Sequence, residues 1–301
     1  MKILITGGKG LVGTALAKKL LEHNHEVLFL SRNPGRNALQ VPEFYWDVDK
    51  SEIAAEAFTD VEVIVHLAGA SINKRWTSAY KEEIVNSRVL STRLLLQYAE
   101  QLNPPLKKFI SASAVGYYPN DLERTFSEKD EPGQDFLSRV CIAWEREAHT
   151  FEELSVSTAI VRIGVVLSME GGALPQIVQP IKMGAGAALG TGRQYMSWIH
   201  LQDLAGIFFH LVSQPELTGV YNAAAPQSVT NEVFTKQAAQ ILGKWVLPLN
   251  VPVAALKLAL GEMAATALSS QKVNPQKIID TGYQFQFPEL APALRELLIG
   301  D

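Results

Sequence analysis

Three regularly spaced glycines and a basic residue that follows them are the first groups in this chain whose spacing points to chemistry. Gly7, Gly10 and Gly13 lie three apart in TGGKGLVG, between a short apolar run and a helical pattern. Glycine permits a sharp turn, lets the backbone approach a pyrophosphate and brings the helix N-terminus to the anion. The pattern predicts a dinucleotide site. The alternative is a purely structural turn, which needs the same glycines.

Arg32 bears on which dinucleotide is bound. In such folds the end of the second strand faces the adenosine ribose, where a carboxylate holds the 2′-hydroxyl. Residues 30–33 are Leu-Ser-Arg-Asn, with no acid among them. A guanidinium pairs well with a phosphate dianion, and Ser31 can add a hydrogen bond. We therefore expect NADP rather than NAD, whereas a solvated arginine in a surface turn would leave the cofactor open.

Alternating strands and helices must bring these groups together. Residues 2–6 form a β-like run, the apolar positions after Gly13 follow helical spacing, and 27–30 form a second strand. Further strand-like runs end at small or polar residues, and a helical face stops before Pro104. The expected fold class is α/β, a Rossmann-type doubly wound parallel sheet. These further runs are 61–70, 107–116 and 156–167.

The pattern changes after Leu167. Residues 170–194 contain six glycines and two prolines, which predicts a long mobile segment over a site. A helix is expected at 197–212 and a last strand at 219–226. The predicted domains are an NADP-binding domain and a smaller, mainly helical substrate lobe. The first comprises 1–167, with 196–225 returning to it, and the second comprises 168–195 and 226–301.

Composition and charge exclude several classes of partner. The chain has 301 residues, 47% of them apolar, and a net charge of −4, so no basic field favours nucleic acid. No apolar run approaches the roughly 18 residues of a membrane span. The start, MKILITGG, has no signal-peptide pattern, and Cys141 is the only cysteine. We expect a cytoplasmic protein with a small-molecule partner and no metal, since the six histidines lack metal-ligand spacing.

Several longer blocks resemble the extended or atypical branch of the short-chain dehydrogenase/reductase superfamily. The glycine motif alone is typical of the whole superfamily, whereas the later blocks are more specific. They are similar to proteins described as epimerase family proteins, NAD-dependent epimerase/dehydratase-like and with a C-terminal domain of unknown function. The similarity extends over essentially the whole chain. The blocks are LAGA at 67–70, KRWT at 74–77, SRVLSTR at 87–93, SASAVGYY at 111–118, VRIGVVLS at 161–168, GTGRQYMSWIH at 190–200 and NPQKIIDTGYQFQFPEL at 274–290.

The resemblance implies positions for the cofactor-binding residues. Glycine-turn residues would surround the pyrophosphate, and the second-strand end would meet the 2′-phosphate. The LAGA segment would pass the adenosine, the following helix would reach the cofactor, and a later strand end would line the nicotinamide. In that order, the residues are Gly7, Gly10, Leu11, Val12 and Gly13; Ser31 and Arg32; Leu67, Ala68 and Gly69; Glu83 and Arg88; and Val166.

The chain departs from this family pattern at its catalytic positions. Catalytic members use a serine or threonine with Tyr-x-x-x-Lys, in which the tyrosine exchanges a proton and the lysine lowers its pKa. Ser113 matches the serine, but the tyrosine and lysine positions hold Leu137 and Cys141. Tyr117 is the candidate substitute. A core role for this aromatic remains the alternative.

Three other residues have open roles at this stage. Cys141 is a nucleophile in principle, although a single cysteine in an apolar helix is usually buried and inert. His200, in the WIH block, is expected to anchor structure. Arg162 either orients a substrate anion or pairs with a carboxylate.

The sequence supports two functions. The first is an NADP-dependent oxidoreductase or nucleotide-sugar-epimerase-like enzyme acting on a small polar molecule, with Ser113 polarising a substrate oxygen. The second is a non-catalytic NADP(H)-binding sensor or regulatory protein. The missing tyrosine and lysine favour the sensor, and a full substrate lobe favours the enzyme. Neither the substrate nor the oligomeric state follows from the sequence.

Overall fold

An eight-stranded sheet forms the base of the molecule in the computed structural model, which describes residues 1–102 and 104–300. The strands lie in the order β4-β3-β2-β1-β5-β6-β8-β12, and every pair is parallel except β3 with β4. Their bounds are β1 Lys2–Thr6, β2 Glu26–Ser31, β3 Glu43–Asp47, β4 Glu52–Ile53, β5 Val63–His66, β6 Lys108–Ala114, β8 Ser157–Ile163 and β12 Gly219–Ala223.

The strand order reverses between β1 and β5. From β1 the chain moves outward to β2 and β3, then returns to pair β5 on the other side. In open α/β sheets the ligand crevice lies beyond the carboxyl ends of the strands at such a reversal. Thr6 and His66 are paired at this end of β1 and β5.

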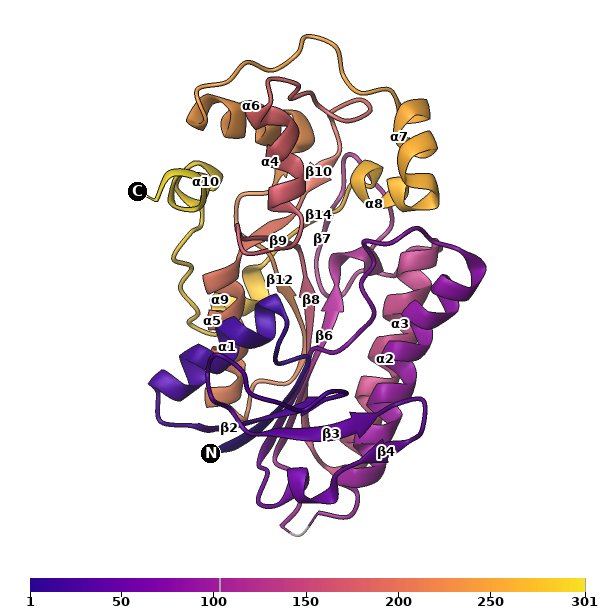
Figure 1. Ribbon diagram of the computed structural model, residues 1–301, viewed down its shortest axis with the longest axis vertical. Coiled ribbons are helices and arrows are strands. Elements are labelled where there is room, and N and C mark those ends of the chain that lie inside the picture. The colour runs from indigo at the N-terminus through magenta and orange to yellow at the C-terminus, as the bar shows by residue number, and fades with distance from the viewer. Residues whose placement is uncertain (103, 301) are drawn as a thin grey trace.

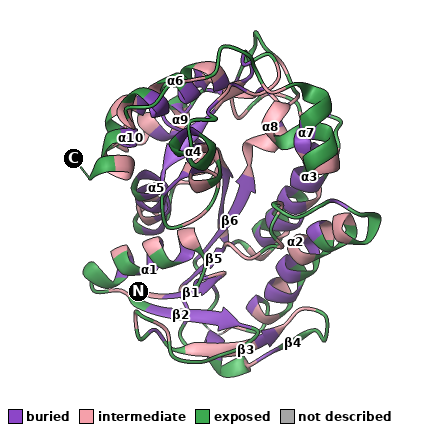
Figure 2. Ribbon diagram, turned by 45° about the horizontal axis from the view of Figure 1, so that its top comes forward, coloured by how far each residue is buried: buried purple, intermediate pink, exposed green. Residues whose placement is uncertain are grey.

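Helices cover both faces of the sheet, which confirms the doubly wound fold (Figures 1 and 2). Helices α1 (Leu11–Glu22) and α5 (Leu201–Ser213) pack on one face, and α2 (Ser78–Ala99) and α3 (Phe136–His149) on the other. The two faces alternate along β1, because Ile3 and Ile5 pack with the first pair and Leu4 with the second. Parallel strands covered on both faces explain the near-continuous apolar runs.

The C-terminal part is mainly helical and lies at the opposite end of the long axis from β3 (Figure 1). Its own apolar cluster joins three helices through Val178, Phe234 and Leu294. Its helices are α4 Leu174–Lys182, α6 Asn231–Ile241, α7 Val253–Leu260, α8 Ala264–Leu268 and α10 Leu290–Ile299, whereas α9 Gln276–Asp280 packs on the sheet domain through Ile278.

Short strand pairs connect this part to the sheet domain. The pair β14 (Lys272–Val273) with β7 (Thr125–Phe126) joins segments far apart in the sequence. The others are β9 (Val165–Leu167) with β11 (Trp198–His200), and β10 (Tyr195–Met196) with β13 (Val229–Thr230). Four short 3₁₀ segments complete the described elements: η1 Ala55–Phe58, η2 Val115–Tyr117, η3 Thr150–Leu154 and η4 Gly261–Met263.

Two predicted elements were wrong in part. The segment 170–194 is not all loop, because α4 buries Leu174, Val178 and Ile181 in the C-terminal cluster. The helix expected at 197–212 begins only at Leu201, since 198–200 is a buried strand paired with β9. The proposed domain boundaries stay a prediction, and residue 301 lies outside the described part. No helix in 1–102 or 104–300 combines the length and apolar character needed to cross a membrane.

Candidate functional site

The glycine turn forms the first wall of the site. Gly7 has φ +69°, and a Cβ there would lie 3.0 Å from the carbonyl carbon of Leu67. A Cβ on Gly13 would lie 2.4 Å from the carbonyl oxygen of Gly7, so the helix packs closely on the turn. Gly10 is the N-cap of α1, whose first turn includes Leu11 and Val12 and receives no side-chain cap. Amides at such a helix start can bind an anion, and their contact with a pyrophosphate stays a prediction.

A buried histidine holds the neighbouring LAGA segment in place. His66 Nδ1 lies 2.7 Å from the Thr6 hydroxyl, and its Nε2 lies 3.1 Å from the Ser91 hydroxyl. The amides of Leu67 and Ala68 donate to the same Thr6 oxygen, at 3.2 and 3.1 Å. Burial lowers the pKa of His66 to about 3, so the ring is neutral. Sequence reasoning missed His66, although its place at the end of a strand was a usable signal.

Arg88 reaches from α2 to this segment. Its guanidinium donates to the carbonyl oxygens of Ile84 and Ala70, at 2.9 and 3.2 Å, and packs over the Trp144 ring. A Cβ on Gly69 would lie 3.0 Å from the guanidinium carbon. Burial lowers the pKa of Arg88. The Arg88 guanidinium thus lies against Gly69, in the segment that follows the carboxyl end of β5.

The predicted 2′-phosphate corner combines an exposed arginine with a lysine that sequence reasoning missed. Ser31 ends β2, its hydroxyl accepts from the Asn33 amide at 3.2 Å, and Arg32 is exposed beside it. Lys9, within the glycine turn, donates to the Asn33 carbonyl at 2.9 Å and to Glu43 at 3.1 Å. These two contacts connect the glycine turn to the loop that follows β2.

Ser113 belongs to a row of polar residues across three strands. Ser113 on β6 is paired with Arg162 on β8, which is paired with Asn222 on β12. The Ser113 hydroxyl donates to Glu145 at 2.6 Å, and Ser113 is 2% exposed. Arg162 donates to both oxygens of Glu145, at 2.8 and 2.7 Å, and to the hydroxyl of Tyr118 at 2.9 Å. Arg162 therefore pairs with a carboxylate, one of its two open roles.

Electrostatics makes this row a closed ionic network. Burial lowers the pKa of Arg162, but the hydrogen bonds and charge of Glu145 outweigh burial and raise the pKa above its usual value. The Tyr118 hydroxyl in turn donates a hydrogen bond to the Asn222 side-chain oxygen at 2.7 Å. Glu145 was overlooked as a partner, although it is an acid on the buried side of α3. The catalytic role of Ser113 stays a prediction.

Tyr117 differs from Tyr118 in its surroundings. It is half-buried at the end of β6, and its ring lies over the Arg162 guanidinium, with 3.3 Å between the guanidinium carbon and the ring centroid. Burial raises the pKa of Tyr117, and the charge of Arg162 opposes that effect. The ring also packs beside Val115 and the cluster around Tyr118, so the chemical and core roles are compatible. Its catalytic role is likewise a prediction.

The two positions that the resemblance assigns to tyrosine and lysine hold no acid–base group. Leu137 packs against the buried cluster of Trp76, Ile84 and Val140, to which α2 and α3 contribute. Cys141 is buried, its thiol lies 3.7 Å from the Ala114 carbonyl oxygen, and burial raises its pKa to about 12. A thiol with this pKa is a poor nucleophile at neutral pH.

The remaining predicted residues lie in different environments. Val166 is half-buried on β9, and a Cβ on Gly172 would lie 3.6 Å from both its carbonyl oxygen and the Leu11 side chain. The segment after β9 therefore passes over the start of α1. Glu83 is an exposed residue of α2. His200 lies 3.1 Å from Glu296 and stacks on Phe287, as an anchoring residue would.

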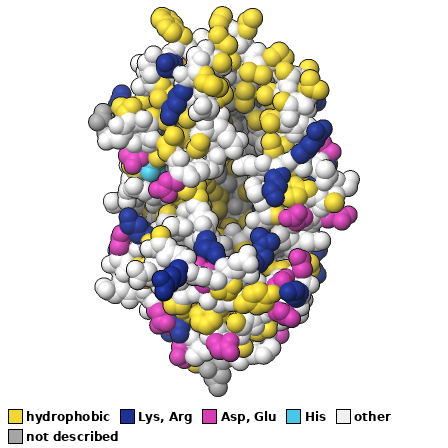
Figure 3. Space-filling model, in the orientation of Figure 1, with side chains coloured by type: hydrophobic (Ala, Val, Ile, Leu, Met, Phe, Trp, Pro, Cys, Tyr) yellow, Lys and Arg dark blue, Asp and Glu magenta, His cyan; other side chains and the backbone are white. Residues whose placement is uncertain are grey.

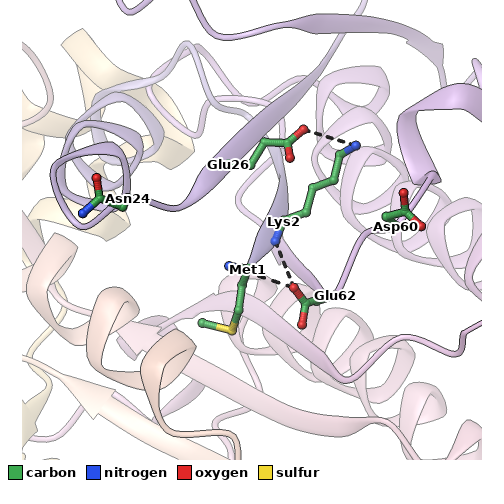
Figure 4. A pocket seen from close by; sticks show the side chains of 6 residues that line it. All are labelled: Met1, Lys2, Asn24, Glu26, Asp60 and Glu62. Atoms are coloured by element: carbon green, nitrogen blue, oxygen red, sulfur yellow. Dashed lines mark hydrogen bonds and ion pairs between the residues drawn. The ribbon is translucent and has the colours of Figure 1, made fainter.

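One hollow lies away from these residues, at the amino ends of the strands. It has a volume of about 380 Å³ and lies where β1, β2 and β5 begin, so its lining includes Lys2, Glu26 and Glu62 (Figure 4). Lys2 pairs with Glu26 at 3.2 Å, and Glu62 accepts from the Lys2 amide at 3.3 Å. Figure 3 shows a separate hollow between the sheet and the C-terminal part. Within 1–102 and 104–300, no three His, Cys, Asp or Glu residues form a metal-binding group.

Comparison with known proteins gives matches over the whole chain. The NAD dependent epimerase/dehydratase family matches residues 3–224, and a Domain of unknown function (DUF1731) matches residues 251–297. The Epimerase family protein SSP1921 of Staphylococcus saprophyticus is 37% identical, over 98% of each chain. The human Epimerase family protein SDR39U1 is 36% identical, over 99% of this chain and 100% of the human one.

Solved structures agree with these matches. A crystal structure of human SDR39U1 with NADPH superimposes with a TM-score of 0.89 at 33% identity, over 99% of both chains. A nucleoside-diphosphate sugar epimerase from Corynebacterium glutamicum has a TM-score of 0.80 at 30% identity, over 99% of this chain and 58% of that one. The predicted resemblance is thus confirmed, and the chain belongs to the NAD dependent epimerase/dehydratase family, among its epimerase family proteins with a C-terminal DUF1731 domain.

Proposed function

We propose that this protein binds NADP(H) and exchanges hydride with a small molecule held between the sheet and the C-terminal part. The observation that supports it most is the uncapped N-terminus of α1, with its glycine turn beside Ser31 and Arg32. Glycine at positions 7 and 13 lets the turn and the helix approach each other this closely, since a Cβ at either position would meet backbone atoms of Leu67 or Gly7; a turn of this kind suits a dinucleotide. The human relative was crystallised with NADPH. The bound nicotinamide would supply or accept the hydride.

The chain's own residues hold the two ends of such a cofactor. The amides of Leu11, Val12 and Gly13 would donate to the pyrophosphate, and Arg32 with Ser31 would bind the 2′-phosphate. The segment Leu67–Gly69, fixed through Thr6 and His66, would lie along the adenosine portion. Val166 would contact the nicotinamide. Arg88 and Glu83 stay proposed cofactor contacts from α2.

Tyr117 is the group we assign to proton transfer. Its phenol lies in η2, directly after β6. Burial raises the pKa of Tyr117, and the Arg162 charge beneath the ring opposes that effect and so favours the phenolate that forms when the proton leaves. The Ser113 hydroxyl donates its one hydrogen bond to Glu145, which leaves it no proton to donate to a substrate. We therefore assign Ser113 as a positioning residue, which acts through Glu145 and Arg162. The network thus fixes the guanidinium that supports Tyr117.

A sensor of cofactor state is the second candidate. Leu137 and Cys141 provide no acid–base group, and the Ser113 network is already satisfied within the protein. A protein that binds NADP(H) without turnover needs only the glycine-turn side of the site. The enzyme is the first proposal because the half-buried Tyr117 lies beside a fixed cation at the carboxyl edge of the sheet.

One set of measurements separates these functions. Calorimetry gives the affinity for NADPH and NADH, and absorbance follows NADPH with a panel of aldehydes, ketones and nucleotide sugars. In the enzyme, Tyr117→Phe keeps NADPH affinity and loses turnover by ~100-fold or more, the range of general acid catalysis. Ser113→Ala lowers turnover less. Tight binding without turnover across the panel favours the sensor, and no binding of either nucleotide contradicts both proposals.

A further inference from the structure

Large apolar side chains stand in solvent at the far end of the C-terminal part. Trp245 is 90% exposed, Leu249 80% and Leu258 86%. Two other exposed residues, Met183 and Leu247, lie close by, because the Leu247 amide donates to the Gly186 carbonyl at 2.7 Å. Hydrophobic side chains gather at this end of the space-filling view (Figure 3). We call Met183, Trp245, Leu247, Leu249 and Leu258 the apolar tip.

Helix α7 beside these residues has an unusual composition for its exposure. Its sequence is VAALKLAL, with one charged residue, yet of its eight residues only Leu256 is buried. Figure 2 shows the helix mostly in the colour of exposed residues. A helix that is apolar all round is normally buried in protein or lipid. Exposed apolar surface of this extent marks an interaction site.

The two segments that carry the apolar tip contain basic residues and no acidic ones. Residues 171–202 and 233–261 contain no aspartate or glutamate, whereas the whole chain has a net charge of −4. The flanking acids are paired, Glu232 with Lys236 and Glu262 with Lys81. The basic residues of the two segments are Lys182, Arg193, Lys236, Lys244 and Lys257.

We propose that the apolar tip docks on an anionic lipid surface, with Trp245, Leu249 and Leu258 in the interface and Lys182, Lys244 and Lys257 at the headgroups. Interfacial binding combines buried apolar area with attraction between basic side chains and anionic lipids. A second copy of the chain is a poorer partner, because a symmetric contact would bring the same lysines face to face. The loop between α6 and α7 protrudes at this end of the molecule, where it can reach a lipid surface (Figure 1).

This inference does not depend on the proposed function. The expectation of no membrane partner came from the lack of an apolar run long enough to span a bilayer. A protein that lies on a bilayer needs no such run. The apolar tip is also remote in sequence from the glycine turn, so its substitution leaves the predicted cofactor residues intact.

Sedimentation of the full chain with lipid vesicles tests the proposal. Vesicles of phosphatidylcholine alone are compared with vesicles of equal parts phosphatidylcholine and phosphatidylserine. We expect the chain to bind the vesicles that contain phosphatidylserine more tightly than those of phosphatidylcholine alone, and we expect added salt to weaken this binding. The fluorescence of Trp245, isolated by comparison with Trp245→Phe, shifts to the blue when the side chain leaves water.

Two variants and a control connect the binding to the apolar tip. Trp245→Glu with Leu249→Glu lowers affinity at least ~10-fold. Replacing Lys182, Lys244 and Lys257 by Gln lowers it about 100-fold. Leu122→Glu, at a position 44% exposed outside the apolar tip, leaves binding unchanged. Circular dichroism and thermal melts check that each variant is folded.

Three outcomes overturn the proposal. One is a failure of the unmodified protein to bind anionic vesicles. Another is equal binding by the unmodified chain and the Trp245→Glu/Leu249→Glu variant. The third is concentration-dependent dimerisation that this variant abolishes, without vesicle binding, which would assign the apolar tip to a second copy. NADPH affinity is measured in parallel, so a loss of lipid binding with normal NADPH affinity leaves the proposed function untouched.

Discussion

The two sides of the sheet's carboxyl edge differ in how their polar groups are used. Around the glycine turn, the first turn of α1 has no side-chain cap and Arg32 is exposed, so donors remain for a ligand. Around Ser113, the hydroxyl donates to Glu145 and both Glu145 oxygens accept from Arg162. The first side is prepared to bind an anion, whereas the second is already closed on itself. The proposed cofactor binding and the proposed proton transfer would therefore have separate determinants.

The largest expected effect is the loss of the buried ion pair on the closed side. Arg162→Leu leaves the Glu145 carboxylate buried without a cation and lowers the free energy of unfolding by about 3–5 kcal/mol. Urea unfolding of the variant and of the unmodified protein measures this change in the free energy of unfolding. The exposed pair Lys236–Glu232 is the matched control, because Lys236→Met costs only about 0.5 kcal/mol. A cost for Arg162→Leu no larger than this control would show that the network is not a closed ionic unit.

The next effect tests the packing of the open side. Gly13→Ala places a Cβ 2.4 Å from the Gly7 carbonyl oxygen, a backbone atom that cannot move without opening the turn. We expect a loss of about 3 kcal/mol of stability, the upper end for an overpacked core, and a clear loss of NADPH affinity by calorimetry. Gly171→Ala is the control, because a Cβ there meets nothing within 4 Å. Normal NADPH affinity in Gly13→Ala would separate the turn from the cofactor.

A charge reversal tests which nucleotide the open side prefers. Arg32→Glu replaces the cation at the end of β2 and repels a 2′-phosphate, so NADPH affinity falls by about 2 kcal/mol, or roughly 30-fold, while NADH affinity does not fall. Arg36→Glu, exposed in the same loop, controls for general charge effects. The assignment of Arg32 is wrong if the two substitutions change the NADPH affinity equally.

The smallest effect is a pH dependence from His66. Because the folded pKa of about 3 lies below the unfolded value of 6.5, the unfolded chain binds the proton first as pH falls. The stability from His66 is complete above pH 6.5 and is lost between 6.5 and 3. From pH 6.5 to 5.5 the loss is about 1 kcal/mol, and at lower pH it approaches about 1.4 kcal/mol per pH unit. His66→Asn removes this part of the slope, and an unchanged slope in urea titrations would contradict the burial of a neutral ring.

Periodicity and glycine spacing were enough to predict the sheet and the glycine turn. The runs at 2–6 and 27–30 are strands, and the helix after Gly13 follows them, because both patterns are local. Helix α4 was missed because glycines and prolines surround its apolar positions, and packing against α6 decides its structure.

The closed network was beyond a local pattern. Ser113 and Arg162 are 49 positions apart in the sequence but are partners across β6 and β8. Their contact depends on strand register and on the side of α3 that holds Glu145, neither of which a single run of residues encodes. The strand-end position of Ser113 was predictable, whereas its hydrogen-bond partner, Glu145, was not.

The pairing of β14 with β7 also affects how the protein is made. Thr125–Phe126 leaves the ribosome well before Lys272–Val273, which completes the pairing. At the usual rate of translation this interval is roughly 7–30 s, long compared with the folding of a nascent sheet. Strand β7 must then wait without its β14 partner until residues 272–273 have been synthesised.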